Sequence, residues 1–184
     1  MRKLNKSLLS AILLAVFVMP VTALAVDSAA VVDAKVNDAI ANFEKEVDGS
    51  EVFLGQAAGY LVFPRVIKLG IGIGGETGDG ALRVNGKTAG YYRTSAGSFG
   101  LQLGAQAKSI VIAFMTKESL DKFVNSSGWK VGVDGSVALI DLGAGKTIDS
   151  HNIKDPVVGF IFGSKGLMYN LTLEGTKITK VERK

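Results

Sequence analysis

Between Gly59 and Ala107, large apolar residues alternate with glycine along short predicted strands. The first run sets Ile67, Leu69, Ile71 and Ile73 against Lys68, Gly70, Gly72 and Gly74. A second run, residues 99–107, repeats the device with Gly100 and Gly104. A period of two places each set on its own side of a pleated strand. Glycine weakens a strand interior, so repeated glycine indicates tight curvature or a close approach of backbone or ligand. The pattern predicts a strongly bent antiparallel sheet and excludes a dinucleotide fingerprint, whose glycines open a helix.

The first 25 residues have the pattern of a secretory signal. Three basic residues precede an apolar run from Leu8 to Met19, and Pro20 ends that run. Ala23 and Ala25 then supply a small-x-small cleavage site, so we expect the mature chain to begin at Val26 in the periplasm or outside the cell. The apolar run is shorter than the ~20 residues that span a bilayer. The chain has no cysteine, which excludes disulfides, thiol catalysis and cysteine-based metal sites.

Removing this segment changes the charge balance of the chain. The full sequence carries 21 basic and 17 acidic residues, a net charge of +4. Without residues 1–25, 18 basic residues face 17 acids, a net charge of +1. The excess of basic residues is therefore no indication of nucleic-acid binding. Residues 26–52 hold seven acids and two lysines, so an acidic helix precedes a basic body.

The elements expected are few. Asp27 or Ser28 can cap a helix to about Val47, with one apolar stripe (Val32, Val36, Ile40, Phe43 and Val47) that we expect to pack on the domain. A short helix over residues 51–58 follows. Strands are predicted at 60–63, 67–74, 81–84, 88–93, 99–107 and 109–115, and then around residues 131–139, 157–162 and 167–173. Asn85-Gly86 predicts a hairpin, while residues 76–80 and 163–166 are predicted as turns. Residues 117–124 are expected to form an inserted helix.

Three blocks of this sequence resemble the SYLF domain family. They are residues 59–80, residues 98–106 followed by an apolar strand and 115–123, and residues 164–168 with 173–175. The resemblance covers about 130 residues, from Ser50 to the C-terminus. Eukaryotic members bind phosphoinositide membranes and, in some cases, actin, whereas bacterial members are mostly secreted. The resemblance therefore implies lipid binding, in the secreted bacterial branch. Actin is an improbable partner for an exported bacterial protein.

Other motifs point to weaker alternatives. Residues 143–147, Gly-Ala-Gly-Lys-Thr, resemble the end of a phosphate-binding loop, but Ile140 replaces the required glycine and a loop follows. His151 is the only histidine, which makes a zinc site or a Ser-His-Asp hydrolase improbable. Glu76 and Asp79 are interpreted as solvated acids of a turn, although they could pair as acid and base or hold calcium. We expect no enzyme activity, cofactor, metal or nucleotide.

The remaining constellation is basic. Arg65 and Lys68 lie beside glycines, and Lys108 and Lys165 are placed in loops of the other two blocks. If strand pairing gathers them, they form a cationic rim beside exposed apolar edges such as Phe63 and Leu167. Lipid contact is thus assigned to the residues Arg65, Lys68, Gly70, Gly72, Gly74, Lys108 and Lys165. The alternative is that these glycines allow the sheet to curve and contact no ligand.

The sequence therefore predicts one α+β domain over residues 26–184, with about 50–184 as the family-matching core. Its antiparallel sheet is expected to be strongly curved or barrel-like and packed by an N-terminal helix and one inserted helix. The expected function is non-enzymatic binding of anionic phospholipid or a membrane surface in the periplasm. The alternative is a structural or interaction protein of the cell envelope without a lipid ligand.

Overall fold

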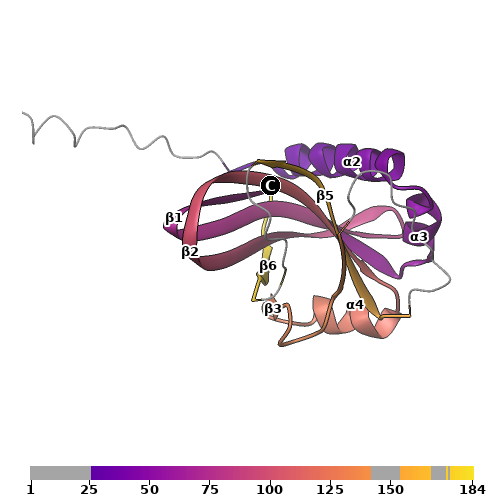
Figure 1. The fold of residues 1–184 in the computed structure, drawn as a ribbon. Coiled ribbons are helices and arrows are strands. Elements are labelled where there is room, and N and C mark those ends of the chain that lie inside the picture. Colours follow the sequence, from indigo (N-terminus) through magenta and orange to yellow (C-terminus); the bar gives the residue numbers. More distant parts are fainter. Residues whose placement is uncertain (1–25, 142–153, 167–172, 174) are drawn as a thin grey trace, which may run out of the picture.

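The computed structural model describes residues 26–141, 154–166, 173 and 175–184. Residues 1–25, the 143–147 motif, His151 and Leu167 lie outside these ranges, so the predictions made for them stay predictions. Figure 1 shows an α+β fold, as predicted, in which one curled sheet lies between helices on its two sides. None of the described helices is both long and apolar enough to cross a bilayer.

Three helices form where the sequence predicts them. Helix α2, Ala29–Glu46, begins after Ser28, whose hydroxyl accepts a hydrogen bond from the Val31 N–H. Helix α3, Ser50–Gln56, follows Gly49, which has a positive φ of 82°. Helix α4, Lys117–Val124, is capped by the Thr116 hydroxyl, which accepts from the Ser119 N–H at 3.1 Å.

The described residues form a six-stranded sheet around one long ribbon. Strands β1, Gly59–Val84, and β2, Lys87–Phe114, pair antiparallel along their whole length. Asn85 and Gly86 join them with φ of 51° and 74°, which confirms the predicted hairpin. The other edge of β2 pairs first with β6, Lys177–Val181, and then with β5, Val157–Gly166. Strand β3, Trp129–Lys130, pairs antiparallel with β6, and strand β4, Ala138–Asp141, pairs parallel with β5.

Several predicted breaks in the strands are wrong. Residues 76–80 were expected to turn but continue β1, where Glu76 pairs with Ala96 and Gly80 with Tyr92. Residues 163–166 likewise belong to β5. Of the predicted strand over 131–139, only residues 138 and 139 lie in a strand, β4, because residues 132–134 form a turn closed by a bridge between Val131 and Gly135. Bulges and bends keep long strands continuous where a local reading of glycine suggests termination.

Glycine allows β1 to fold back onto itself. A Cβ at Gly80 would lie 2.1 Å from the Val62 carbonyl oxygen, and one at Gly78 would lie 2.6 Å from that of Arg65. At Gly70 the added carbon would lie 2.6 Å from the Gly74 Cα. The two halves of β1 therefore touch through their backbones, and the face that carries Gly78 and Gly80 is the inside of the bend. We call this the inner face of the ribbon.

Two apolar cores lie on opposite faces of the sheet. The core on the inner face joins Leu61, Leu82, Ile110 and Phe114 to residues of α4 and β3, and its aromatic rings include Phe123 and Trp129. On the outer face, α2 covers the sheet with Val32, Val36, Ala39 and Phe43, and Phe43 contacts Phe160 and Phe162 at ring-centroid distances of 5.3 and 5.0 Å. The acidic helix therefore packs on the domain, as its apolar stripe predicts.

Candidate functional site

The bend of the ribbon divides the predicted cationic site between two faces. Arg65 is exposed on the outer face, whereas Lys68 and Lys108 are only 7% and 3% exposed. Lys108 lies in β2 and not in a loop, because the pattern of β2 is continuous from Lys87 to Phe114. Lys165 is also in a strand, where it pairs with Ala107. The exposed rim that sequence predicts is therefore wrong as a single surface.

The inner face carries a group of buried polar residues that we call the inner cluster: Lys68, Glu76, Gln106 and Lys108. Lys68 pairs with Gln106 across the ribbon, and Val66 pairs with Lys108. The Lys108 Nζ lies 3.0 Å from Glu76 Oε1, with both side chains almost fully buried. Neither of these two atoms makes a directed hydrogen bond to a described residue. Lys68 makes no ion pair with any residue that the structure describes.

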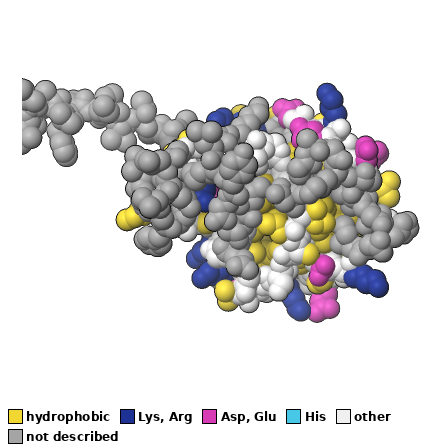
Figure 2. Space-filling model, viewed as in Figure 1, with side chains coloured by type: hydrophobic (Ala, Val, Ile, Leu, Met, Phe, Trp, Pro, Cys, Tyr) yellow, Lys and Arg dark blue, Asp and Glu magenta, His cyan; other side chains and the backbone are white. Residues whose placement is uncertain are grey.

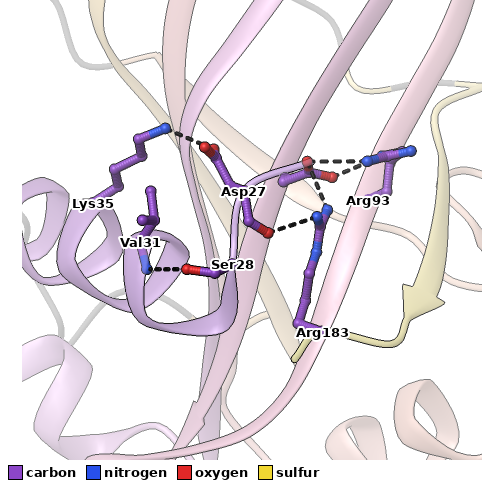
Figure 3. Close-up of polar contacts among 7 residues, drawn as sticks. Asp27, Ser28, Val31, Lys35, Arg93 and Arg183 are labelled. Carbon is purple, nitrogen blue, oxygen red and sulfur yellow. Dashed lines mark hydrogen bonds and ion pairs between the residues drawn. The ribbon is translucent and has the colours of Figure 1, made fainter. Parts of the chain in front are cut away.

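A second polar group, the terminal cluster, joins the start of α2 to the end of the chain (Figure 3). Arg93 donates two hydrogen bonds to Asp79, at 2.7 and 3.1 Å. Arg183 also pairs with Asp79, at 2.7 Å, and donates to the Asp27 carbonyl oxygen at 2.9 Å. Burial opposes ionisation of Asp79, but the hydrogen bonds and charges of the two arginines outweigh it and lower its pKa.

Hydrogen bonds to Asp33 also attach helix α2 to the sheet. Arg83 donates to Asp33 at 3.0 Å and to Asn37 at 2.7 Å, and the Tyr91 hydroxyl donates to Asp33 at 2.7 Å. Burial raises the pKa of Asp33, yet these donors and Thr88 outweigh it and leave the pKa below its ordinary value. The same hydrogen bond, with burial, raises the pKa of Tyr91. These bonds fix the helix to the β1–β2 hairpin.

The outer face of the bend presents aliphatic side chains to solvent. Leu69 is 57% exposed and Ile73 is 71% exposed. Next to them lies a groove of about 470 Å³ between the start of α2 and β1, lined in part by Lys35, Arg65 and Ile67. Figure 2 shows basic and apolar side chains close together on the visible surface. Phe63, which was expected as an exposed edge, is buried because it belongs to the core on the inner face.

The glycine face is explained in part by the backbone. Gly70 lies where β1 approaches itself, so the backbone contact alone explains why this position has no side chain, and no ligand is needed to explain it. Gly74 is the residue that Gly70 approaches, and Gly72 lies between the two. Sequence reasoning identified these glycines but could not separate curvature from ligand contact, because both require the absence of a Cβ.

Comparison with known proteins places the second half of the chain. Residues 95–184 match the family described as "Ysc84: Las17-binding protein actin regulator". Over these residues the chain is similar to the Ysc84/SYLF domain family. No curated protein matches the sequence. The Ysc84/SYLF segment includes two of the three blocks that predicted the resemblance, while the block at residues 59–80 lies before it.

The boundary of the Ysc84/SYLF segment crosses the candidate site. Lys108 and Lys165 lie within the segment, whereas Arg65, Lys68 and the glycines of β1 lie before it. Arg93 also precedes the segment, but its neighbour in the terminal cluster, Arg183, lies inside it. The ribbon joins both parts into one pairing, since β1 is bonded to β2 from Gly59 to Val84. Sequence reasoning missed Leu69 and Ile73 as surface residues and Arg183 as a partner of Asp79.

The described residues show no grouping suited to metal catalysis. No cluster of three or more histidine, aspartate or glutamate side chains occurs within the described ranges. Glu76 and Asp79, the one pair considered as acid and base, point to opposite faces of β1 because they are three positions apart in a strand. Each is engaged by a different cation, Lys108 for Glu76 and Arg93 for Asp79. The two carboxylates therefore cannot act on one substrate.

Proposed function

We propose that this protein is a non-enzymatic, periplasmic lipid-binding protein that recognises the surface of membranes rich in anionic phospholipid. The observation that carries the proposal is the outer face of the bend, where two largely exposed aliphatic side chains, Leu69 and Ile73, lie near the exposed Arg65. The Ysc84/SYLF match supports it, because the resemblance to that domain implies lipid binding. The pattern of residues 1–25 supports export.

The chemistry of this face suits an interface between water and lipid. Burial of one large aliphatic side chain is worth about 1.5–3 kcal/mol when it is complete. Leu69 and Ile73 are already partly covered, so insertion would contribute less than that range for each. A cation near an anionic bilayer adds about 1 kcal/mol. Arg65 makes no ion pair with a described residue, so its charge is available to the membrane.

These contributions predict weak and reversible binding. Two partial insertions and one or two cations amount to about 3–6 kcal/mol, which corresponds to dissociation constants between about 6 mM and 0.04 mM. Binding of this kind should weaken as salt rises, because the screening length falls from ~30 Å at 0.01 M to ~8 Å at 0.15 M.

The test is co-sedimentation with vesicles. We expect wild-type protein to sediment with vesicles rich in phosphatidylglycerol, much less with pure phosphatidylcholine, and less in 0.15 M than in 0.01 M salt. Replacing Leu69 and Ile73 together by serine should reduce binding at both salt concentrations. Arg65→Glu should reduce it chiefly at low salt.

Matched control variants distinguish a binding site at the bend from nonspecific binding to vesicles. Val52 on α3 and Val124 on α4 are 60% and 41% exposed and lie outside the ribbon, so replacing both by serine should leave binding unchanged. Lys117→Glu, on α4, is the charge control for Arg65→Glu. Equal losses in variants and controls would refute a site at the bend.

The second candidate is a structural or interaction protein of the cell envelope with no lipid ligand. It is favoured by the contacts of Gly70, Gly78 and Gly80, which explain these glycines through the fold of β1 alone. Failure of the folded wild-type protein to bind either kind of vesicle would support this candidate over the first.

A further inference from the structure

The inner cluster contains one more cation than it can pair. Lys68 and Lys108 carry two positive charges, and Glu76 supplies one negative charge to Lys108. Lys68 is 7% exposed and makes neither an ion pair nor a hydrogen bond with a described residue. Buried charges in proteins are generally paired, because removal from water is otherwise unfavourable. The Lys68 ammonium has no such partner among the described residues and keeps contact with solvent, so an anion from solution can reach it.

Strand pairing brings the two lysines to the same place. Lys68 lies opposite Gln106, and Lys108 is two residues further along the same face of β2. Diagonal neighbours of this kind are about 7–8 Å apart, within reach of two flexible lysine side chains. The Glu76 carboxylate meets Lys108 from the other half of β1, since the strand folds back on itself. The two lysines thus lie on the same face of the ribbon, and a single carboxylate, that of Glu76, pairs with Lys108.

The ligand that fits this balance is an oxyanion with one negative charge. We propose that Lys68 and Lys108 bind a phosphate-type oxyanion on the inner face of the bent ribbon. A phosphodiester brings the cluster to neutrality, and lysine is a common point-charge partner of phosphate. The oxyanion could come from either of two sources. One is the headgroup of an anionic phospholipid, and for this source the inference rests on the proposed function. Free phosphate is the other source and offers the same oxygens.

The experiment follows thermal unfolding of the purified protein with three additions. Inorganic phosphate is compared with chloride at equal ionic strength, and dihexanoyl phosphatidylglycerol, kept below its micelle concentration, serves as a soluble lipid. We expect a saturable rise in the melting temperature with phosphate or the soluble lipid that chloride does not give. A response to the soluble lipid alone would assign the lipid as the source. A response to phosphate of equal or greater strength would assign the free ion.

Variants locate the effect. Lys68→Met removes the unpaired cation and leaves the Lys108–Glu76 pair, so the affinity should fall at least tenfold. Lys87→Met, which removes an exposed lysine from the same ribbon, should leave the affinity unchanged. Glu76→Gln removes the competing carboxylate and should increase the affinity several-fold. If Lys68→Met does not fold, as judged by circular dichroism, the wild-type titrations and Glu76→Gln decide the matter.

The outcomes separate this inference from the membrane function. Equal responses to phosphate, soluble lipid and chloride would overturn the oxyanion site, and so would a Lys68→Met variant that folds and binds like the wild type. Vesicle binding in the absence of any oxyanion response would leave the membrane function standing and overturn the inner site alone. A phosphate response without vesicle binding would support the inner site and refute the membrane proposal.

Discussion

Two clusters on one strand have the same charges and different geometry. The inner cluster and the terminal cluster each oppose one carboxylate of β1 to two cations, and the carboxylates, Glu76 and Asp79, are three residues apart. Asp79 is bonded by both of its arginines, and Arg183 also reaches the Asp27 backbone. Glu76 pairs with Lys108 only, and Lys68 is left without a counter-ion among the described residues. The difference indicates that the terminal cluster holds the two ends of the domain together, whereas the inner cluster contains one cation, Lys68, that has no counter-ion among the described residues.

The side chains account for this difference. A guanidinium presents several donors in a planar fork, so two arginines can share one carboxylate and still bond elsewhere. An ammonium is a compact charge on a flexible stem, and two of them compete for one carboxylate. Arginine is the residue that completes a structural network, and lysine is the residue that can exchange one partner for another. The following changes test whether the two clusters differ in this way.

The largest effect is expected from Lys108→Met. This change leaves the nearly buried Glu76 carboxylate without its cation, and breaking one side of a buried ion pair costs about 3–5 kcal/mol. Urea unfolding of the variant measures the loss. Adding Glu76→Gln should recover a substantial part of it, because the uncompensated charge is then removed. A loss below about 1 kcal/mol would show that Lys68 can take over as the partner of Glu76.

The next effect concerns the backbone contact that holds both clusters in place. Gly80→Ala would set a Cβ 2.1 Å from the Val62 carbonyl oxygen and 2.7 Å from the Phe63 ring, so the halves of β1 must separate. Overpacking of this kind costs about 3 kcal/mol. Gly75→Ala is the control on the same strand, because its nearest neighbour is 4.0 Å away. Similar urea midpoints for the two variants would mean that the fold-back is not a tight contact.

The sequence predicts the helices and the hairpin correctly but not the continuous course of β1, because only the first two depend on local signals. The helices α2 and α4 follow from caps and periodicity within a single segment, so Ser28, Thr116 and the apolar stripe were sufficient. The hairpin at Asn85-Gly86 is equally local. Residues 76–80 were misread as a turn, because glycine beside Asp79 is typical of turns and the contact of Gly80 with Val62 is not visible in the local sequence.

The prediction of one exposed basic rim is wrong for a related reason. Arg65, Lys68 and Lys108 are polar residues of one sequence pattern, but a bulge between Phe63 and Val66 and the bend decide which face each residue takes. A bulge shifts the alternation by one residue and sends the side chains that follow to the other face. The exposed side chains at the bend, Leu69 and Ile73, read as core residues in a period-two pattern. Only pairing over the whole ribbon shows that the described chain leaves them largely exposed.

Arg93→Met should have a smaller effect than either change above. Arg93 is 43% exposed, and Arg183 would still pair with Asp79, so we expect a loss of about 1 kcal/mol in the free energy of unfolding. Lys122→Met breaks the exposed ion pair with Glu118 on α4 and should leave the free energy of unfolding nearly unchanged, because solvent screens the pair. If Arg93→Met costs as much as Lys108→Met, the terminal cluster is no more redundant than the inner one, and the contrast between them is lost.

The smallest effect is the dependence of stability on pH. The folded state lowers the pKa of Asp79, so this carboxylate stabilises the fold above the ordinary range near pH 4. That stability is lost as the pH falls through the lowered pKa, because the proton then removes the charge that holds Arg93 and Arg183. Urea midpoints measured from pH 5 to pH 3 should therefore decline less steeply in Asp79→Asn than in the wild type. Asp38→Asn, at an exposed position of α2, should follow the wild-type curve. Parallel curves for all three proteins would show that the two arginines contribute position to the terminal cluster but no charge-dependent stability.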